Sequence, residues 1–315
     1  MNPEPLRIAI LGPTCSGKSA TALALAAGLG ADLISCDSMQ VYRGMDIGTA
    51  KPTKEEQRRV PHHLVDVLAL AQPYNVNIFL ELCRPIIDTL GRTQTPCVLA
   101  GGSGLYARSL LYGHRLLPAD KTVYAAAWAA VLDGHMAELV AELATLSPAC
   151  AATVGKNPRH LARAIEVLRL TGMAPDNPRQ QGQNPGINPG NWHEIVIIPP
   201  WPEHREMIAA RTRKMLADGW IEETRQLMDV GLETAPTARQ ALGYPEILSF
   251  LHGNIKNRDE LATLITTKTI QLARRQRTWF KHQHPSAIQI PAFMFEPTIG
   301  VKICQEILRG QGVCS

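Results

Sequence analysis

Residues 12–19, with the sequence GPTCSGKS, have the types and spacing needed to bind a phosphate group. They match G-x-x-x-x-G-K-[ST], in which backbone N–H groups surround an anion, the lysine adds a positive charge and the last hydroxyl can ligate a divalent cation. The apolar run 7–11 before this loop predicts a strand, and the Ala- and Leu-rich residues 19–29 predict a helix. We therefore predict a di- or triphosphate site, with Ser19 as a metal ligand, formed by Gly12, Pro13, Thr14, Cys15, Ser16, Gly17, Lys18 and Ser19.

Two polar residues follow further apolar runs. Residues 31–36 predict a strand that ends before Asp37, and residues 96–100 predict one followed by glycines and Ser103. Ligands bind beyond the carboxyl ends of the strands in open parallel sheets, so both side chains are expected beside the phosphate loop. Asp37 could act there as a general base or metal ligand, or could only cap a turn.

The strand predicted over residues 96–100 carries no aspartate. A nucleotide hydrolase of the phosphate-loop class has an Asp on such a strand as a magnesium ligand. Its absence argues against ATP hydrolysis as the main activity.

Basic side chains form two clusters outside the phosphate loop. Residues 268–281 contain five Lys or Arg and no acid, and helical spacing places Arg274, Arg277 and Lys281 on one face. On that helix Ile265, Leu272 and Trp279 form an apolar face. The second cluster consists of Arg159, His160, Arg163 and Arg169. Each cluster could be only a solvated face, but two of them favour a nucleic-acid ligand.

Three arginines lie in or before the helix predicted over residues 208–228. Arg205, Arg211 and Arg213 could each reach a phosphate, and the local pattern does not distinguish them. His62 and His63 are adjacent, so on regular structure their side chains point apart, which argues against a metal pair.

Composition indicates a folded protein of two lobes. The 315 residues are 45% hydrophobic and 19% charged, with a formal net charge of +4. No apolar run is long enough to span a membrane and residues 1–7 lack a secretory signal, so we expect a cytoplasmic protein without a membrane partner. The seven cysteines form no C-x-x-C pair, and most of them are expected to be buried small hydrophobes. Cys15 differs because it lies inside the phosphate loop, where a thiol could be modified.

The rest of the chain predicts a mainly helical segment and a return to the sheet. Residues 118–171 favour helices, the Pro- and Gly-rich residues 173–192 predict a connector, and residues 194–198 predict a strand. A long helix is expected over residues 261–281, and the tail after Pro291 shows no pattern.

Seven segments in order along the chain together resemble the tRNA dimethylallyltransferases, also called tRNA isopentenyltransferases. Their residue ranges are 12–19 (GPTCSGKS), 37–52 (DSMQVYRGMDIGTAKP), 61–67 (PHHLVDV), 101–106 (GGSGLY), 157–168 (NPRHLARAIEVL), 239–244 (RQALGY) and 271–279 (QLARRQRTW). The resemblance implies an α/β fold, a P-loop NTPase-like parallel sheet core with a mostly helical insertion domain. It implies core segments 1–115 and 193–290, an insertion 116–192 that contacts tRNA, and a tail 291–315.

The resemblance also implies a reaction. A dimethylallyl group passes from dimethylallyl diphosphate to the N6 amine of the adenosine just 3′ of the anticodon, with Mg²⁺ as cofactor. Asp37 matches the general base, Lys18 and Arg211 neutralise the leaving diphosphate, and Ser103 offers it a hydroxyl. The anticodon stem-loop of tRNA is the expected partner, and its adenine must leave the base stack.

The tRNA-binding residues come from the same match and from the basic helix. They are Asp37, Ser38, Met39, Gln40, Arg159, His160, Leu161, Ala162, Arg163, Arg239, Gln240, Gly243, Tyr244, Arg274 and Arg277. The chain departs from the family at three residues, where Ser103 replaces Thr, Asn157 replaces Asp and Met207 replaces an Arg. The connector after Gly172 also follows the family pattern poorly.

Three other functions remain open. An enzyme that prenylates free adenine nucleotides would show competition by AMP, a small-molecule kinase would convert ATP to ADP, and an RNA-binding module would show no donor-dependent chemistry. We expect a monomer because no heptad repeat or broad apolar stripe is present.

Overall fold

The computed structural model describes residues 5–113, 117–175 and 191–291, with Lys302 and Glu306. The chain divides into two compact units: unit 1 comprises Met1–Leu111 and Pro189–Ser315, and unit 2 comprises Tyr112–Asn188. Unit 2 thus begins and ends four residues earlier than the insertion predicted over residues 116–192. Most of the predicted connector and nearly all of the tail lie outside the described residues.

A parallel sheet of six strands forms the centre of unit 1 in the described residues, in the order β3-β2-β4-β1-β5-β6. The strands are β1 (Arg7–Leu11), β2 (Asp32–Ser35), β3 (His62–His63), β4 (Cys97–Gly101), β5 (Trp192–Ile197) and β6 (Ile288–Ile290). Fully buried Ile8 and Ile10 of β1 pack with Ala22 and Leu25 of the following helix. This arrangement confirms the predicted α/β parallel sheet core.

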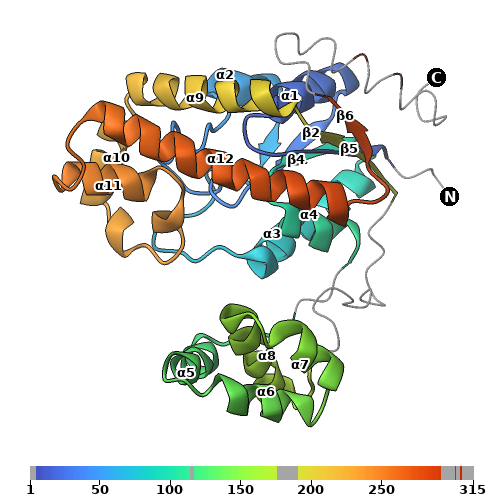
Figure 1. The fold of residues 1–315 in the computed structure, drawn as a ribbon. Coiled ribbons are helices and arrows are strands. Elements are labelled where there is room, and N and C mark those ends of the chain that lie inside the picture. The colour runs from blue at the N-terminus through green and yellow to red at the C-terminus, as the bar shows by residue number, and fades with distance from the viewer. Residues whose placement is uncertain (1–4, 114–116, 176–190, 292–301, 303–305, 307–315) are drawn as a thin grey trace. The chain divides into compact units, whose positions relative to one another are not determined.

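Unit 1 also contains helices, some of which pack on other helices rather than on the sheet. They are α1 (Lys18–Leu29), α2 (Lys54–Arg59), α3 (Val76–Arg92), α4 (Gly104–Leu111), α9 (Trp201–Ala217), α10 (Trp220–Asp229), α11 (Tyr244–Leu251) and α12 (Arg258–Gln283), with 3₁₀ turns η1 (Leu232–Thr234) and η2 (Ala238–Gln240). Helix α12 packs against α9, α4 and α11 (Figure 1). It confirms the helix predicted over residues 261–281.

The single long helix predicted over residues 208–228 is wrong. Helix α9 ends at Ala217 and α10 begins at Trp220. Between them Gly219 has φ +105°, a left-handed conformation that favours glycine and breaks the helical path. The break allows Trp220 to be buried at the start of a separate helix.

Four helices make up the described part of unit 2: α5 (Lys121–Leu132), α6 (Met136–Ala144), α7 (Pro148–Val154) and α8 (Pro158–Thr171). Asn157 accepts N–H bonds from Arg159 and His160, and Pro158 occupies the first turn, a favourable start for α8. Leu161, Ile165 and Leu168 on α8 belong to the hydrophobic core of this unit. The predicted helical insertion thus folds around its own core.

No helix in the described parts of the chain is long and apolar enough to cross a membrane. The five cysteines that fall in these parts, Cys15, Cys36, Cys83, Cys97 and Cys150, are buried, which confirms the prediction for them. Cys304 and Cys314 lie outside the described residues.

Candidate active site

The phosphate loop joins β1 to α1, as the sequence predicts. Gly12 passes so close to β5 that a Cβ atom there would lie 2.4 Å from the carbonyl oxygen of Ile197. Gly17, immediately before α1, has φ +83°. The two glycines therefore allow a tight loop that only residues without a side chain can form at these positions.

The loop presents donors for an anion. The Ser16 hydroxyl is buried and has no hydrogen-bond partner among the described residues. Lys18 begins α1 and donates to the carbonyl oxygen of Pro13 at 3.3 Å. Burial lowers the pKa of Lys18, the nearby Arg211 guanidinium lowers it further, and the Asp37 carboxylate opposes both effects. An oxyanion bound here would satisfy Ser16 and favour the charged form of Lys18.

Side chains from α9 and α12 fix the phosphate loop from behind. The backbone N–H of Thr14 donates to Gln276 Oε1 at 2.8 Å, and Gln276 Nε2 donates to the carbonyl oxygen of Gly102 at 2.9 Å. His204, fully buried, donates from Nε2 to the carbonyl oxygen of Thr14 at 2.7 Å. Burial lowers the pKa of His204, which keeps this imidazole neutral. Gln276 thus connects the phosphate loop to the glycine-rich loop before Ser103.

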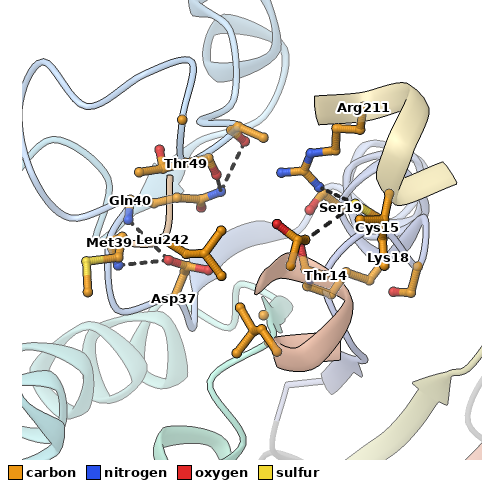
Figure 2. Close-up of a pocket in the computed structure, with 18 of the residues that line it drawn as sticks. Thr14, Cys15, Lys18, Ser19, Asp37, Met39, Gln40, Thr49, Arg211 and Leu242 are labelled. Carbon is orange, nitrogen blue, oxygen red and sulfur yellow. Dashed lines mark hydrogen bonds between the residues drawn. The ribbon is translucent and has the colours of Figure 1, made fainter. Parts of the chain in front are cut away.

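Asp37 follows β2 on the opposite side of the site (Figure 2). Its Oδ1 atom accepts N–H bonds from Met39 at 2.8 Å and Gln40 at 3.3 Å. Its Oδ2 atom accepts no hydrogen bond from the residues that the structure describes. One oxygen therefore caps the turn while the other is available, so the two roles considered for Asp37 are compatible.

A cavity of about 570 Å³ connects these two sides. Figure 2 shows Thr14, Cys15, Lys18, Ser19 and Arg211 on one side and Asp37, Met39, Gln40 and Thr49 on the other. The predicted residues that line the cavity are Thr14, Cys15, Ser16, Gly17, Lys18, Ser19, Asp37, Ser38, Met39, Gln40, Ser103 and Arg211. Gly12 and Pro13, the first two residues of the loop, are buried and do not line the cavity. The structure thus brings together residues from β1–α1, β2, β4 and α9.

Arg211 is the one of the three candidate arginines that lines the cavity. It donates from a guanidinium nitrogen to Cys15 Sγ at 3.5 Å, whereas Arg205 and Arg213 are exposed on α9 outside it. Sequence analysis missed Thr49, Thr212, Gln276 and the apolar wall formed by Ile208, Met215, Trp220, Leu242, Ile265 and Leu272. The helical periods of α9 and α12 could have indicated Ile208, Met215, Ile265 and Leu272, whereas Trp220 and Leu242 lie outside these two helices.

Two basic side chains of helix α12 contact other parts of unit 1. Arg274 and Arg277 both stack on the Trp201 ring, each at 5.2 Å from its centroid. Arg277 also donates to the carbonyl oxygen of Pro199, and burial lowers its pKa. Arg274 remains exposed, so it is the better placed of the two for an external anion.

Of the tRNA-binding residues predicted for positions 239–244 of unit 1, two are exposed and two are buried. Arg239 and Gln240 are exposed in η2. The prediction that Gly243 and Tyr244 face RNA is wrong in this structure, because both are buried against Trp220. A Cβ atom on Gly243 would lie 2.0 Å from the Trp220 ring, so a glycine is required for this packing.

The tRNA-binding residues predicted in unit 2 also differ in their exposure. Arg159 and His160 are exposed at the start of α8. Arg163 instead pairs with the buried Glu166, also on α8. Leu161 and Ala162 are fully buried in the core of the unit, which contradicts a role for their side chains in RNA contact.

The histidine pair has structural partners. His62 Nδ1 lies 2.7 Å from the carbonyl oxygen of Val60, and His63 Nε2 lies 2.7 Å from Asp32 Oδ2. In the part of the chain that the structure describes, no three His, Cys, Asp or Glu side chains are grouped to hold a metal ion.

Comparison with known proteins places the chain among enzymes of one kind. Residues 40–283 match the family model IPP transferase, and residues 7–67 match the model Isopentenyl transferase. The chain is 39% identical over 298 residues to a tRNA dimethylallyltransferase of Thermus thermophilus, covering 93% of this chain and 95% of that protein. It is 40% identical over 282 residues to one of Thermobifida fusca, covering 87% and 86%.

Solved structures show the same fold. A tRNA isopentenylpyrophosphate transferase from Bacillus halodurans has a TM-score of 0.70 and 31% identity, covering 98% of this chain and 97% of that one. A eukaryotic dimethylallyltransferase acting on tRNA has a TM-score of 0.75 at 20% identity, covering 96% and 78%. These likenesses confirm the predicted P-loop NTPase-like core.

Proposed function

The chain belongs to the IPP transferase family and transfers a dimethylallyl group to tRNA, and we propose that dimethylallyl diphosphate is the donor and an anticodon-loop adenosine the acceptor. The acceptor atom in this proposal is N6 of the adenosine just 3′ of the anticodon. The observation that supports it is one cavity with the phosphate loop at one side and the unpaired Oδ2 of Asp37 at the other. This geometry suits a reaction in which a diphosphate leaves as an amine loses a proton.

In the proposed reaction, the N6 nitrogen attacks C1 of the donor and the bond from C1 to the bridging oxygen breaks. The electron pair of that bond leaves with the diphosphate, and Asp37 Oδ2 takes the proton from the amine. Lys18 and Arg211 counter the charge that develops on the diphosphate, and the Ser103 hydroxyl donates to it. Each group lines the same cavity.

The donor set of the loop fits Mg²⁺. Ser19 offers one hydroxyl oxygen on the first turn of α1 at the cavity wall. Mg²⁺ is held in phosphate-transfer sites by one or two protein oxygens, with phosphate oxygens and waters as the other ligands. Ser19 would hold the ion on the diphosphate, where it supplies positive charge for the leaving group.

Incubation of the protein with Mg²⁺, unmodified tRNA and labelled dimethylallyl diphosphate tests the proposal, beside parallel reactions with AMP as acceptor and with ATP. We expect label on the tRNA at the adenosine 3′ of the anticodon. Label on AMP alone would assign the activity to free nucleotides, and ATP turnover without transfer would assign a kinase. Light scattering after gel filtration would test the monomer expected from the sequence.

A further inference from the structure

Glu223 on α10 accepts hydrogen bonds from four donors. Its Oε2 atom accepts the backbone N–H groups of Asp46 at 2.9 Å and Ile47 at 2.6 Å. Its Oε1 atom accepts the N–H of Gly48 at 3.2 Å and the hydroxyl of Tyr244 at 2.7 Å. A single carboxylate therefore holds three consecutive backbone amides far away in the sequence.

The packing around this carboxylate leaves its partners little room. A Cβ atom on Gly48 would lie 2.1 Å from Trp220 Nε1 and 2.6 Å from Tyr244 Cε2. Trp220 and Tyr244 are both buried. Burial and the adjacent Glu223 raise the pKa of Tyr244, so the phenol stays protonated and donates to the carboxylate. Residues 46–48 are thus seated against α10 and α11 in one position.

The residues that follow this segment hold the side chain of Gln40. Gln40 Nε2 donates to the carbonyl oxygens of Thr49 at 3.2 Å and Ala50 at 3.1 Å. Gln40 Oε1 accepts the hydroxyl of Ser35 at 2.8 Å. With its amide fixed in this way, Gln40 donates its backbone N–H to Asp37 Oδ1 (Figure 2).

We propose that Glu223, with Tyr244, is a positioning residue for Asp37. Glu223 does not line the cavity and touches no reacting group. It acts through residues 46–50 and Gln40, whose hydrogen bonds orient the Asp37 carboxylate so that Oδ2 faces the acceptor. This inference rests on the proposed role of Asp37 as general base.

Glu223→Gln tests the proposal, because an amide cannot accept from all four donors. We expect kcat for tRNA prenylation to fall by about 10- to 100-fold, the range for a small misplacement of a catalytic group. The KM for the diphosphate donor should stay within about twofold, because among the described residues the hydrogen bonds of Glu223 go to residues 46–48 and Tyr244 and not to the phosphate loop. A wild-type kcat would overturn the proposal.

Two further variants separate positioning from folding. Glu222→Gln is the matched control. Its carboxylate is exposed and forms a long ion pair of 3.7 Å with the exposed Arg258, so its loss should leave kcat at the wild-type value. Tyr244→Phe removes one of the four hydrogen bonds and leaves the three bonds from residues 46–48 in place, so it should lower kcat less than Glu223→Gln does. If Glu223→Gln does not fold, Tyr244→Phe decides: an unchanged kcat overturns the proposal.

A double-mutant cycle with Asp37→Asn distinguishes this proposal from the proposed function. If Glu223 acts through Asp37, adding Glu223→Gln to Asp37→Asn should change kcat by less than about twofold. Additive losses would mean that Glu223 acts elsewhere and would overturn the positioning role alone. A wild-type kcat for Asp37→Asn by itself would instead refute Asp37 as the base.

Discussion

The two carboxylate oxygens of Asp37 have different environments. Oδ1 accepts two backbone N–H bonds, from Met39 and Gln40, and so fixes the direction of the side chain. Oδ2 accepts no hydrogen bond from the described residues, and Asp37 lines a cavity that the phosphate loop also lines. An oriented carboxylate with one free oxygen is the arrangement a general base requires, since proton transfer depends on geometry first.

Asp37→Asn separates these two tasks. The amide oxygen can still accept the N–H groups of Met39 and Gln40, but the side chain can no longer take a proton. We expect kcat for tRNA prenylation to fall by about 10²- to 10⁴-fold, with the Kd for tRNA within a few-fold of wild type. Single-turnover kinetics and filter binding would measure the two quantities. A small loss in kcat would remove Asp37 from the base role.

Lys18 predicts a pH dependence for donor binding. Its pKa is lowered from 10.5 in the free protein by burial and by Arg211, and a bound diphosphate would raise it again. Binding therefore takes up a proton when the pH lies between the two values. The contribution of Lys18 to the affinity is constant below the lowered pKa and falls as the pH rises through it.

Calorimetry with inorganic diphosphate between about pH 7 and about pH 10 would measure this effect. Lys18→Arg is the control, because the guanidinium stays charged over the whole range while the ligand's own titration is unchanged. Wild type should lose more affinity than Lys18→Arg towards high pH. Equal losses would show that Lys18 does not titrate there.

At the scale of elements, the sequence predicts a site well when the residues that form it are contiguous in the chain. The phosphate loop is a contiguous motif between a strand and a helix, so its place in the fold followed from residues 7–29. The break at Gly219 was missed because one glycine interrupts an otherwise helical pattern. Gln276 was missed because its partner Thr14 is 262 positions away, and no local pattern records such a contact.

Burial limited the prediction of interface residues in the same way. Leu161 and Ala162 lie on the apolar face of α8, which the spacing with Ile165 and Leu168 could have indicated. Tyr244 gives no such signal, because an aromatic residue next to a glycine occurs equally in cores and at interfaces. Its burial depends on Trp220 of a different helix.

Helix α12 acts on the site through Gln276, which leads to a prediction at this scale. Gln276→Glu can still accept the Thr14 N–H, but it cannot donate to the carbonyl oxygen of Gly102 and brings a negative charge to the phosphate loop. We expect the Kd for inorganic diphosphate to rise by about tenfold, as a repulsion of about 1.4 kcal/mol between the new carboxylate and the bound anion would give.

Gln271→Glu provides the matched control for Gln276→Glu. It introduces the same charge on an exposed position of α12 and should leave the Kd for diphosphate unchanged within about twofold. A similar effect of both variants would mean that the charge of the helix, not the contact of Gln276, sets the affinity.

At the scale of the whole molecule, the ligand is a polyanion much larger than the cavity. The tRNA backbone offers phosphates to exposed cations on either unit, and each neutralised phosphate steepens the salt dependence of binding. Arg274 in unit 1 and Arg159 in unit 2 are exposed, whereas Arg277 and Arg163 are held by Pro199 and Glu166. Cations with internal partners are expected to contribute to stability rather than to RNA binding.

Arg159 and Arg163, one turn apart on α8, test this distinction. Arg159→Gln should weaken tRNA binding and lower the slope of log Kd against log salt by about 1, measured between about 50 mM and about 200 mM KCl. Arg163→Gln should keep that slope but destabilise unit 2 by about 1–3 kcal/mol, because the buried Glu166 loses its cation. Thermal unfolding of both variants would measure the second effect. If Arg163→Gln lowered the salt slope as much as Arg159→Gln, the pairing with Glu166 would not prevent Arg163 from contacting RNA, and the basic cluster of α8 would act as one surface.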